Sequence, residues 1–218
     1  MSTTSFSVYL SFKVALVATS MVVLVGTALA WLLARRRFWG RTLLDVMLTL
    51  PLVLPPTVTG YYLIVLFGRN GALGKPIYEL TGWTVMFTWW AAVLASFIVA
   101  LPLMIKTARA AMEAVDKRYL EAATMLGYSE RETTFRVLLP LSRRGLIAGA
   151  VLAFARALGE FGATLMVAGN IPGKTDTVPI AIYSAAGSGD WSQANTLVLL
   201  FTGLSALILY VTVKLVGR

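Results

Sequence analysis

The sequence predicts an all-α, polytopic membrane protein with about five transmembrane helices. Of its 218 residues, 58% are hydrophobic and only 13% are charged, and the mean hydropathy of +0.77 lies outside the usual range of soluble proteins. Five apolar runs each approach the roughly 20 residues that a helix needs to cross a bilayer. The basic residues lie beside these runs, which is typical of membrane proteins with a defined orientation.

The five predicted spans follow one another along the chain. They cover residues 14–33, 46–67, 84–105, 146–167 and 196–213, with ends set to within about 2–4 residues. The first span is longer than the apolar core of a secretory signal, and basic residues follow it rather than precede it, so we expect it to be retained. Residues 1–218 are expected to form a single transmembrane domain.

Positive charge predicts the orientation of the chain. Lys and Arg collect after the first span and between the third and fourth spans, namely Arg35, Arg36, Arg37 and Arg41, and then Lys106, Arg109, Lys117, Arg118, Arg131, Arg136, Arg143 and Arg144. By the positive-inside rule both segments are cytoplasmic. We therefore expect a multi-pass protein of the cytoplasmic (inner) membrane, with the N-terminus outside and the C-terminus in the cytoplasm.

The composition excludes most catalytic and metal chemistry. The chain has no His and no Cys, so it offers no disulfide, thiolate, imidazole base or common zinc ligand. We expect no catalytic residue, no metal and no cofactor bound by this chain. The net charge of +9 does not indicate nucleic-acid binding, since that requires a basic face on a soluble domain.

Prolines are expected to interrupt the second and third spans. The stretch 50–60 has three of them, and Pro102 lies near the inner end of the third span. A proline inside a helix removes a backbone donor, and irregular backbone is tolerated in a membrane where it faces protein or a water-filled cavity. A packing kink and a translocation path explain these prolines equally well. For the second possibility the candidate path residues are Pro55, Pro56, Thr57 and Thr59, followed by Gly60.

The cytoplasmic segment of about residues 106–145 is expected to contain two short helices. Asp116 can cap a helix that begins at Lys117, and Gly127 fits the position just past its end. Ser129 and Glu132 match a capping box, and the second helix is predicted to stop at Pro140. Phe135, Leu138 and Leu139 would give this second helix an apolar face.

The first of these helices carries an apolar stripe with small residues at its middle. Tyr119, Ala122, Ala123 and Leu126 recur at i, i+3, i+4 and i+7. Small side chains allow another helix or a groove to approach closely. A hairpin that merely lies on the membrane surface is also compatible with the periodicity.

The spacing of particular residues in this segment is more specific. Its pattern is E-A-A, three residues, Gly, nine residues, an aliphatic residue, one residue and L-P, represented here by Glu121, Ala122, Ala123, Gly127, Val137, Leu139 and Pro140. This pattern resembles the loop shared by permease subunits of binding-protein-dependent ABC transporters. Residues 50–74 and 154–183 are similar to the molybdate permeases of that family, and sulfate permeases share much of "RALGEFGA".

The resemblance implies the type I ABC importer permease fold in its five-helix form. It implies a homodimer, an extracytoplasmic molybdate-binding protein, and two cytoplasmic ATPase subunits that bind ATP and Mg²⁺. It also makes the helix containing Glu121 a coupling helix that docks in the ATPase subunit, with coupling residues Tyr119, Glu121, Ala122, Ala123, Leu126 and Gly127. Lys117 and Arg118 at its edge can fix the register by charge. The implied substrate is molybdate, with tungstate or sulfate as the alternatives.

Two charged residues lie inside the fourth predicted span. Arg156 and Glu160 are four residues apart and share one helix face. They can form a neutralising structural pair, helped by the small residues that follow, or they can line the path. The structural role is favoured, because a bare cation in the path would hold a dianion too tightly for release.

Two short motifs suggest other chemistry and are rejected. "GNIPGKT", residues 169–175, has one residue too few for a P-loop, follows a membrane helix and is expected outside the cell. "GSGD", residues 187–190, lacks the second intramembrane Asp of an aspartyl protease. A polytopic membrane enzyme is disfavoured by the missing His and Cys, and a scaffold or sensor would not need proline-broken spans.

Overall fold

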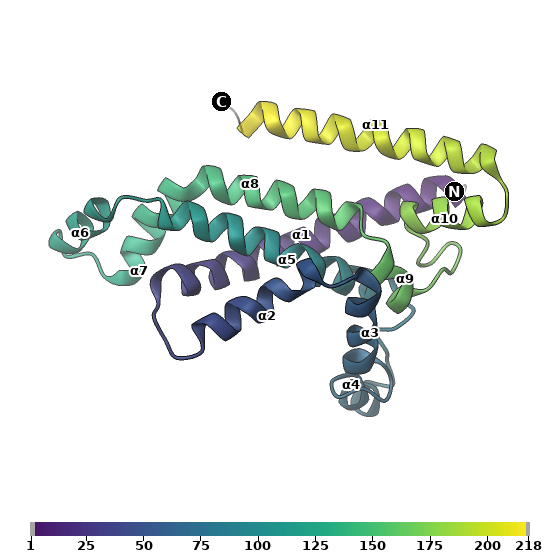
Figure 1. Cartoon of the computed structure of the whole chain (residues 1–218), viewed down its shortest axis with the longest axis horizontal. Coiled ribbons are helices and arrows are strands. Elements are labelled where there is room, and N and C mark those ends of the chain that lie inside the picture. Colours follow the sequence, from purple (N-terminus) through teal and green to yellow (C-terminus); the bar gives the residue numbers. More distant parts are fainter. Residues whose placement is uncertain (1–2, 217–218) are drawn as a thin grey trace.

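The computed structural model describes residues 3–216, which form helices joined by short turns, with no strand among them (Figure 1). The all-α prediction is confirmed. In chain order the elements are α1 (Thr3–Arg35), α2 (Arg41–Val53), α3 (Pro56–Phe67), α4 (Gly74–Thr81), α5 (Trp89–Glu113), α6 (Lys117–Met125), α7 (Glu130–Thr133), the π-helix η1 (Thr134–Leu138), α8 (Leu139–Leu158), α9 (Gly162–Ala168), α10 (Val178–Gly187) and α11 (Trp191–Val216).

Four helices within residues 3–216 are long and apolar enough to cross a membrane. They cover Thr4–Arg35, Trp89–Glu113, Glu130–Leu158 and Trp191–Thr212. A fifth crossing is obtained if α2 and α3, which are bent by 119° at their junction, are counted as one span. The predicted number of about five therefore includes this broken pair.

The break between α2 and α3 comes from the two consecutive prolines. Leu54 and Pro55 each precede a proline and have extended backbone, with ψ of 142° and 139°. A residue before proline is pushed out of the α region by the proline ring, and two such residues in succession end the helix. Pro51 and Pro102 instead lie inside α2 and α5, which continue through them. The expected interruption of the third span at Pro102 is therefore wrong.

The fourth predicted span is also broken, although no break was predicted there. The helix α8 ends at Leu158, and α9 begins at Gly162. Residues 159–161 make the turn between them. The expected continuous span over 146–167 is therefore two helices.

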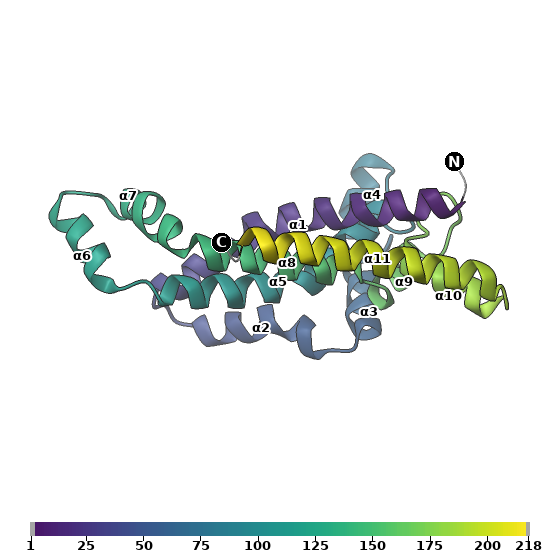
Figure 2. The ribbon, with the colours of Figure 1, turned by 90° about the horizontal axis from the view of Figure 1, so that it is seen from above.

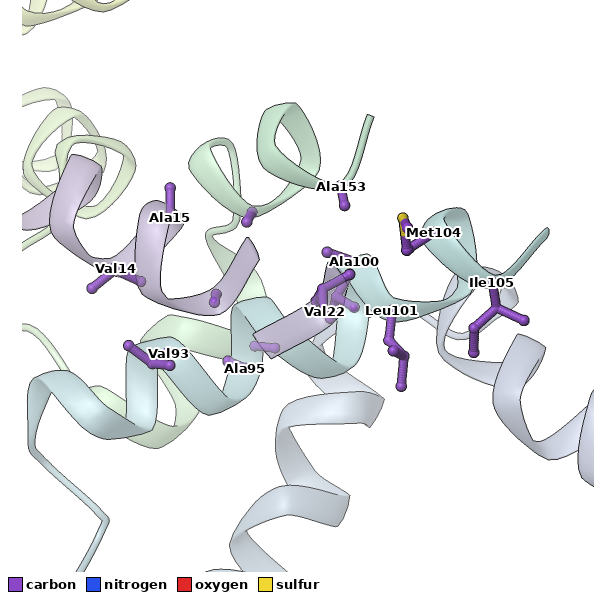
Figure 3. Packing of buried hydrophobic residues seen from close by; sticks show 14 of the residues in the cluster. Val14, Ala15, Val22, Val93, Ala95, Ala100, Leu101, Met104, Ile105 and Ala153 are labelled. Atoms are coloured by element: carbon purple, nitrogen blue, oxygen red, sulfur yellow. The ribbon is translucent and has the colours of Figure 1, made fainter. Parts of the chain in front are cut away.

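The core is formed by α1, α5 and α8, which lie side by side (Figures 1 and 2). Many of the buried residues are alanines, as in the close-up of Ala15, Ala95, Ala100 and Ala153 around Val22 (Figure 3). Small side chains let membrane helices approach closely. Van der Waals packing then holds the helices together, because there is no hydrophobic driving force between helices in lipid.

Glycines bring the three helices of the core close together around Met104. A Cβ added to Gly26 of α1 would lie 2.8 Å from Met104 Cγ, and one added to Gly149 of α8 would lie 2.9 Å from Met104 Sδ. Both distances are shorter than real Cβ contacts. Met104 of α5 is therefore held between the backbones of its two neighbours.

The two ends of this bundle differ. The helices α6 and α7 project beyond one end, and the start of α1 lies at the other end beside α10 (Figures 1 and 2). From α10, α11 runs back along the bundle towards the end that carries α6 (Figure 1).

Candidate functional site

The helix α6 forms as its terminal residues predict. The carboxylate of Asp116 accepts a hydrogen bond from the Arg118 N–H at 2.9 Å. At the other end Gly127 has a φ of +85°, and the next N–H, that of Tyr128, donates to the carbonyl of Ala123 at 3.1 Å. A positive φ is open to glycine at little cost and closes the helix with its last carbonyls satisfied.

The structure divides the predicted apolar stripe between two sides of α6. Tyr119, Ala122 and Leu126 are exposed, as predicted for a docking face. Ala123 is only 4% exposed and, like Leu120, is directed into the protein. The prediction that Ala123 shares the exposed face is therefore wrong. The helix α6 has nine residues, or about two and a half turns, and the side that packs on its own fold includes Ala123.

The exposed side of α6 also includes a residue that the sequence analysis did not select. Met125 is 89% exposed and lies three residues after Ala122. Its i, i+3 spacing from Ala122 was the signal available in the sequence. Glu121 is exposed beside these apolar residues. After the role predicted for this helix, we give the name coupling face to the exposed residues Tyr119, Glu121, Ala122, Met125 and Leu126.

The capping box after the Gly127 turn is present. The Ser129 Oγ accepts from the Glu132 N–H at 3.3 Å, and Glu132 Oε2 accepts from the Ser129 N–H at 3.0 Å. The helix then continues to Leu158, so the prediction that it stops at Pro140 is wrong. The π-helix η1 explains the difference. Leu139 N–H bonds to the carbonyl of Thr134, and this wider turn places Pro140 at the start of α8, where proline is tolerated.

The segment formed by α7 and η1 is tied to the end of α1. Trp31 Nε1 donates to Thr134 Oγ1 at 3.1 Å, and Arg36 forms an ion pair with Glu130 at 2.8 Å. The coupling face thus lies on the first helix of a short helical hairpin. The second helix of this hairpin, formed by α7 and η1, continues directly into α8. Displacement of α6 would act on α5 through residues 114–116 and on α8 through η1.

A group of ion pairs joins α2 to α5 on the side of the bundle near α6. Asp45 of α2 contacts Lys106 Nζ and Arg109 Nη1, both at 2.8 Å. Arg109 Nε also contacts Glu113 at 2.8 Å, and Glu113 lies 3.6 Å from Arg41 of α2. We call these five residues the α2–α5 clamp. It links α5, which leads into α6, to the helix that ends at the double proline.

Removing the charge of Asp45 tests the clamp. We expect Asp45→Asn to lower the midpoint of thermal unfolding of the purified protein by about 2–4 °C, because two charge-assisted contacts worth about 1 kcal/mol in total are weakened. The side chains are partly exposed, so the loss is modest. Glu79→Gln is the matched control, since its pair with Lys75 is longer, at 3.8 Å, and well exposed. Equal midpoints for both variants would contradict a stabilising clamp.

The two broken spans meet at the far end of α2. A Cβ added to Gly162 of α9 would lie 2.9 Å from Pro56 Cβ, and one added to Gly60 of α3 would lie 2.7 Å from Met166 Cβ. The half-helices α3 and α9 are therefore in close contact, and each presents a glycine backbone to a side chain of the other. This contact depends on glycine at both positions.

The candidate path residues are distributed around this contact. Pro55, Pro56 and Thr57 are exposed at the start of α3. Thr59 is only 4% exposed, and its hydroxyl has no hydrogen-bond partner among the described residues. The structure thus brings the four residues to one bend but separates Thr59 from the exposed three.

Arg156 and Glu160 form an ion pair at the break between α8 and α9. Arg156 Nη1 lies 2.7 Å from Glu160 Oε2, and the Glu160 side chain is 1% exposed. Glu160 Oε1 accepts from the N–H of Ala163 at 2.9 Å, so the same carboxylate caps the first turn of α9. Sequence spacing suggested the pair but not the capping contact, because the break itself was not expected.

No group of three or more His, Cys, Asp or Glu side chains is placed to hold a metal ion in the part of the chain that the structure describes. The features that remain are an exposed coupling face, a charged connection between helices, and a junction of two broken spans.

Comparison with known proteins shows the family of this chain. The family model described as "Binding-protein-dependent transport system inner membrane component" matches residues 23–218. The molybdenum transport system permease protein ModB of Escherichia coli K12 is 44% identical over 207 residues, which cover 94% of this chain and 90% of that protein. The sulfate transport system permease protein CysT of Salmonella typhimurium is 34% identical, over 95% of this chain and 76% of that protein.

The fold is shared with a solved transporter structure. An inward-facing structure of the MetNI methionine ABC transporter has a chain that superposes with a TM-score of 0.78 at 17% identity. The match covers 100% of this chain and 96% of that one. At this low identity the likeness concerns the fold alone.

Proposed function

The chain belongs to the family of binding-protein-dependent transport system inner membrane components, and on this premise we propose that it is the permease subunit of an ATP-driven importer of molybdate. The observation that carries the substrate is the 44% identity to a molybdenum permease over nearly the whole of both chains. Identity to the sulfate permease is lower, at 34%. Tungstate and sulfate, which share the shape and charge of molybdate, are the alternatives.

The chain itself is a transport subunit and not an enzyme. Membership of this family implies an ATPase subunit and a binding protein as partners. The coupling face is the surface that fits the ATPase. It combines exposed apolar residues around the small Ala122 with the charge of Glu121, which suits close seating in a groove with a fixed register. ATP and Mg²⁺ would be bound by that partner.

The path is proposed to lie between two copies of this chain. In this arrangement the exposed bend at Pro55, Pro56 and Thr57 faces the second copy. The start of α1 lies outside the cell and α6 in the cytoplasm, in the inner membrane. This orientation is supported by the basic residues near α6 and by the position of the two features at opposite ends of the bundle (Figure 1).

The mechanism follows from how α6 is connected. When the ATPase subunits close on ATP, α6 is displaced and carries with it the ends of α5 and α8. The α2–α5 clamp passes the movement of α5 to α2, and the packing of α3 on α9 couples the two bends. The path would then change its access from one side of the membrane to the other by rigid-body movement of helices. The ion pair of Arg156 and Glu160 keeps the second bend intact as the helices move.

Uptake assays test the proposed substrate. We expect proteoliposomes that contain the permease, its ATPase and its binding protein to accumulate labelled molybdate only when ATP is present on the ATPase side. A tenfold excess of unlabelled tungstate should compete strongly and an equal excess of sulfate weakly. Weak competition at this excess requires that sulfate bind at least about tenfold less tightly than molybdate, which is about 1.4 kcal/mol of discrimination. Preferential uptake of labelled sulfate would contradict molybdate as the substrate. Absence of an ATPase in the purified complex would contradict the importer itself.

A further inference from the structure

A polar pocket lies at the end of the bundle remote from α6. It has a volume of about 250 Å³ and is enclosed by the start of α1, the segment 169–177, α10 and the start of α11. Its polar lining comes from Thr4, Ser7, Asn170, Ser184, Ser188 and Gln193, together with Asp176. Among the residues that the structure describes, none that lines this pocket is basic. The pocket is distinct from the coupling face, the clamp and the junction of the broken spans.

Asp176 is the unusual member of this lining. The residue is only 6% exposed, and its Oδ2 accepts a hydrogen bond from Ser7 Oγ at 3.0 Å. Its Oδ1 is buried and has no hydrogen-bond partner among the described residues. The N–H of Val178, at the start of α10, donates instead to Ser11 Oγ at 2.8 Å. A buried charged carboxylate is costly unless a cation or several donors compensate it.

We propose that this pocket binds a monovalent metal cation, with Asp176 as its charged ligand. Hydroxyl, amide and carboxylate oxygens are ligands for hard cations. One carboxylate neutralises one positive charge, and within residues 3–216 no second carboxylate lines the pocket to compensate a divalent ion. Asn170 and Ser184 reach the pocket from two further elements, so a bound cation would be shared between them and Asp176.

The cation would stabilise the position of segment 169–177. Ser7 and Ser11 of α1 already hold residues 176–178 through two hydrogen bonds. A cation at Asp176 Oδ1 would add a contact from the other side of the same carboxylate and fix segment 169–177 against α10 and α11. This proposal does not depend on which oxyanion is transported.

Thermal unfolding in sodium tests the proposal. The purified full-length permease in its complex with the ATPase would be unfolded in sodium chloride and in N-methyl-D-glucamine chloride at equal ionic strength. We expect sodium to raise the unfolding midpoint by about 2–4 °C, because a ligand that binds the native state stabilises it by mass action. Asp176→Asn should remove this difference. Glu79→Gln, which neutralises an exposed carboxylate on α4, should keep it.

A binding measurement keeps the test decisive if Asp176→Asn fails to accumulate. Equilibrium dialysis with ²²Na⁺ should show saturable binding to the wild-type complex, and Ser184→Ala should weaken it several-fold without lowering the yield. Absence of bound sodium and potassium would mean that water alone fills the pocket, and would overturn the proposal. Stabilisation by calcium but not by sodium or potassium would overturn it as well. Failure of molybdate uptake would affect only the proposed function.

Discussion

Replacing Ala122 by tryptophan is expected to reduce ATP-driven uptake by tenfold or more, a loss of at least about 1.4 kcal/mol of docking energy. Ala122 is the small residue of the coupling face, between the exposed side chains of Tyr119 and Leu126. An indole at this position would hold α6 away from a closely fitting groove. Because the residue is exposed, the permease itself should still insert and fold. Uptake and co-purification of the ATPase would be measured together.

Two other tryptophan variants make this prediction specific. Ala72→Trp, at an exposed position between α3 and α4, should leave recruitment of the ATPase unchanged. Ala123→Trp is expected to fail for another reason. Ala123 is 4% exposed, so a large side chain would overpack α6 against its own fold, at a cost of about 1–3 kcal/mol. Normal ATPase recruitment in Ala122→Trp would remove the coupling face from the proposal.

Replacing Glu160 by glutamine is expected to lower the thermal unfolding midpoint by about 4–12 °C, which corresponds to about 2–3 kcal/mol. The change leaves Arg156 without its partner inside the membrane, while the amide oxygen can still accept the N–H of Ala163. The expected loss is below that for a fully buried pair, because the Arg156 side chain is 29% exposed. Glu160→Ala should cost more, since it also removes the capping contact.

A double-mutant cycle separates structure from transport in this pair. If the two charges mainly neutralise each other, Arg156→Gln combined with Glu160→Gln should recover much of the stability lost by Glu160→Gln alone. Uptake should recover in parallel. Full stability with lost uptake in the double variant would instead show that these charges contact the transported anion.

The features that the sequence predicted well are local ones. The cap at Asp116, the turn at Gly127 and the box of Ser129 with Glu132 are all present. Each depends on residues within a few positions of one another, so that the backbone chemistry is complete in the sequence itself. The break at Pro55 and Pro56 belongs to the same class.

The errors concern features in which neighbours decide the outcome. Pro140 was expected to end a helix, but a π-turn moves it to the start of α8, and contacts from Trp31 to Thr134 and from Arg36 to Glu130 hold that turn against α1. Pro102 lies in the buried middle of α5, which continues through it. The break after Leu158 was not predicted, because no proline lies at this point of the sequence.

The sequence by itself determined that this protein is a helical membrane protein with a capped helix near its basic segments, and the resemblance of its motifs indicated the importer family. Length and apolar content are sufficient for the membrane helices, and bonds within one turn are sufficient for the cap. Only the tertiary structure decided that Ala123 is turned inwards, that Asp45 joins α2 to α5, and that Asp176 is buried beside Ser7. These contacts join residues from separate helices, and which side of a helix is buried depends on the helices that pack against it.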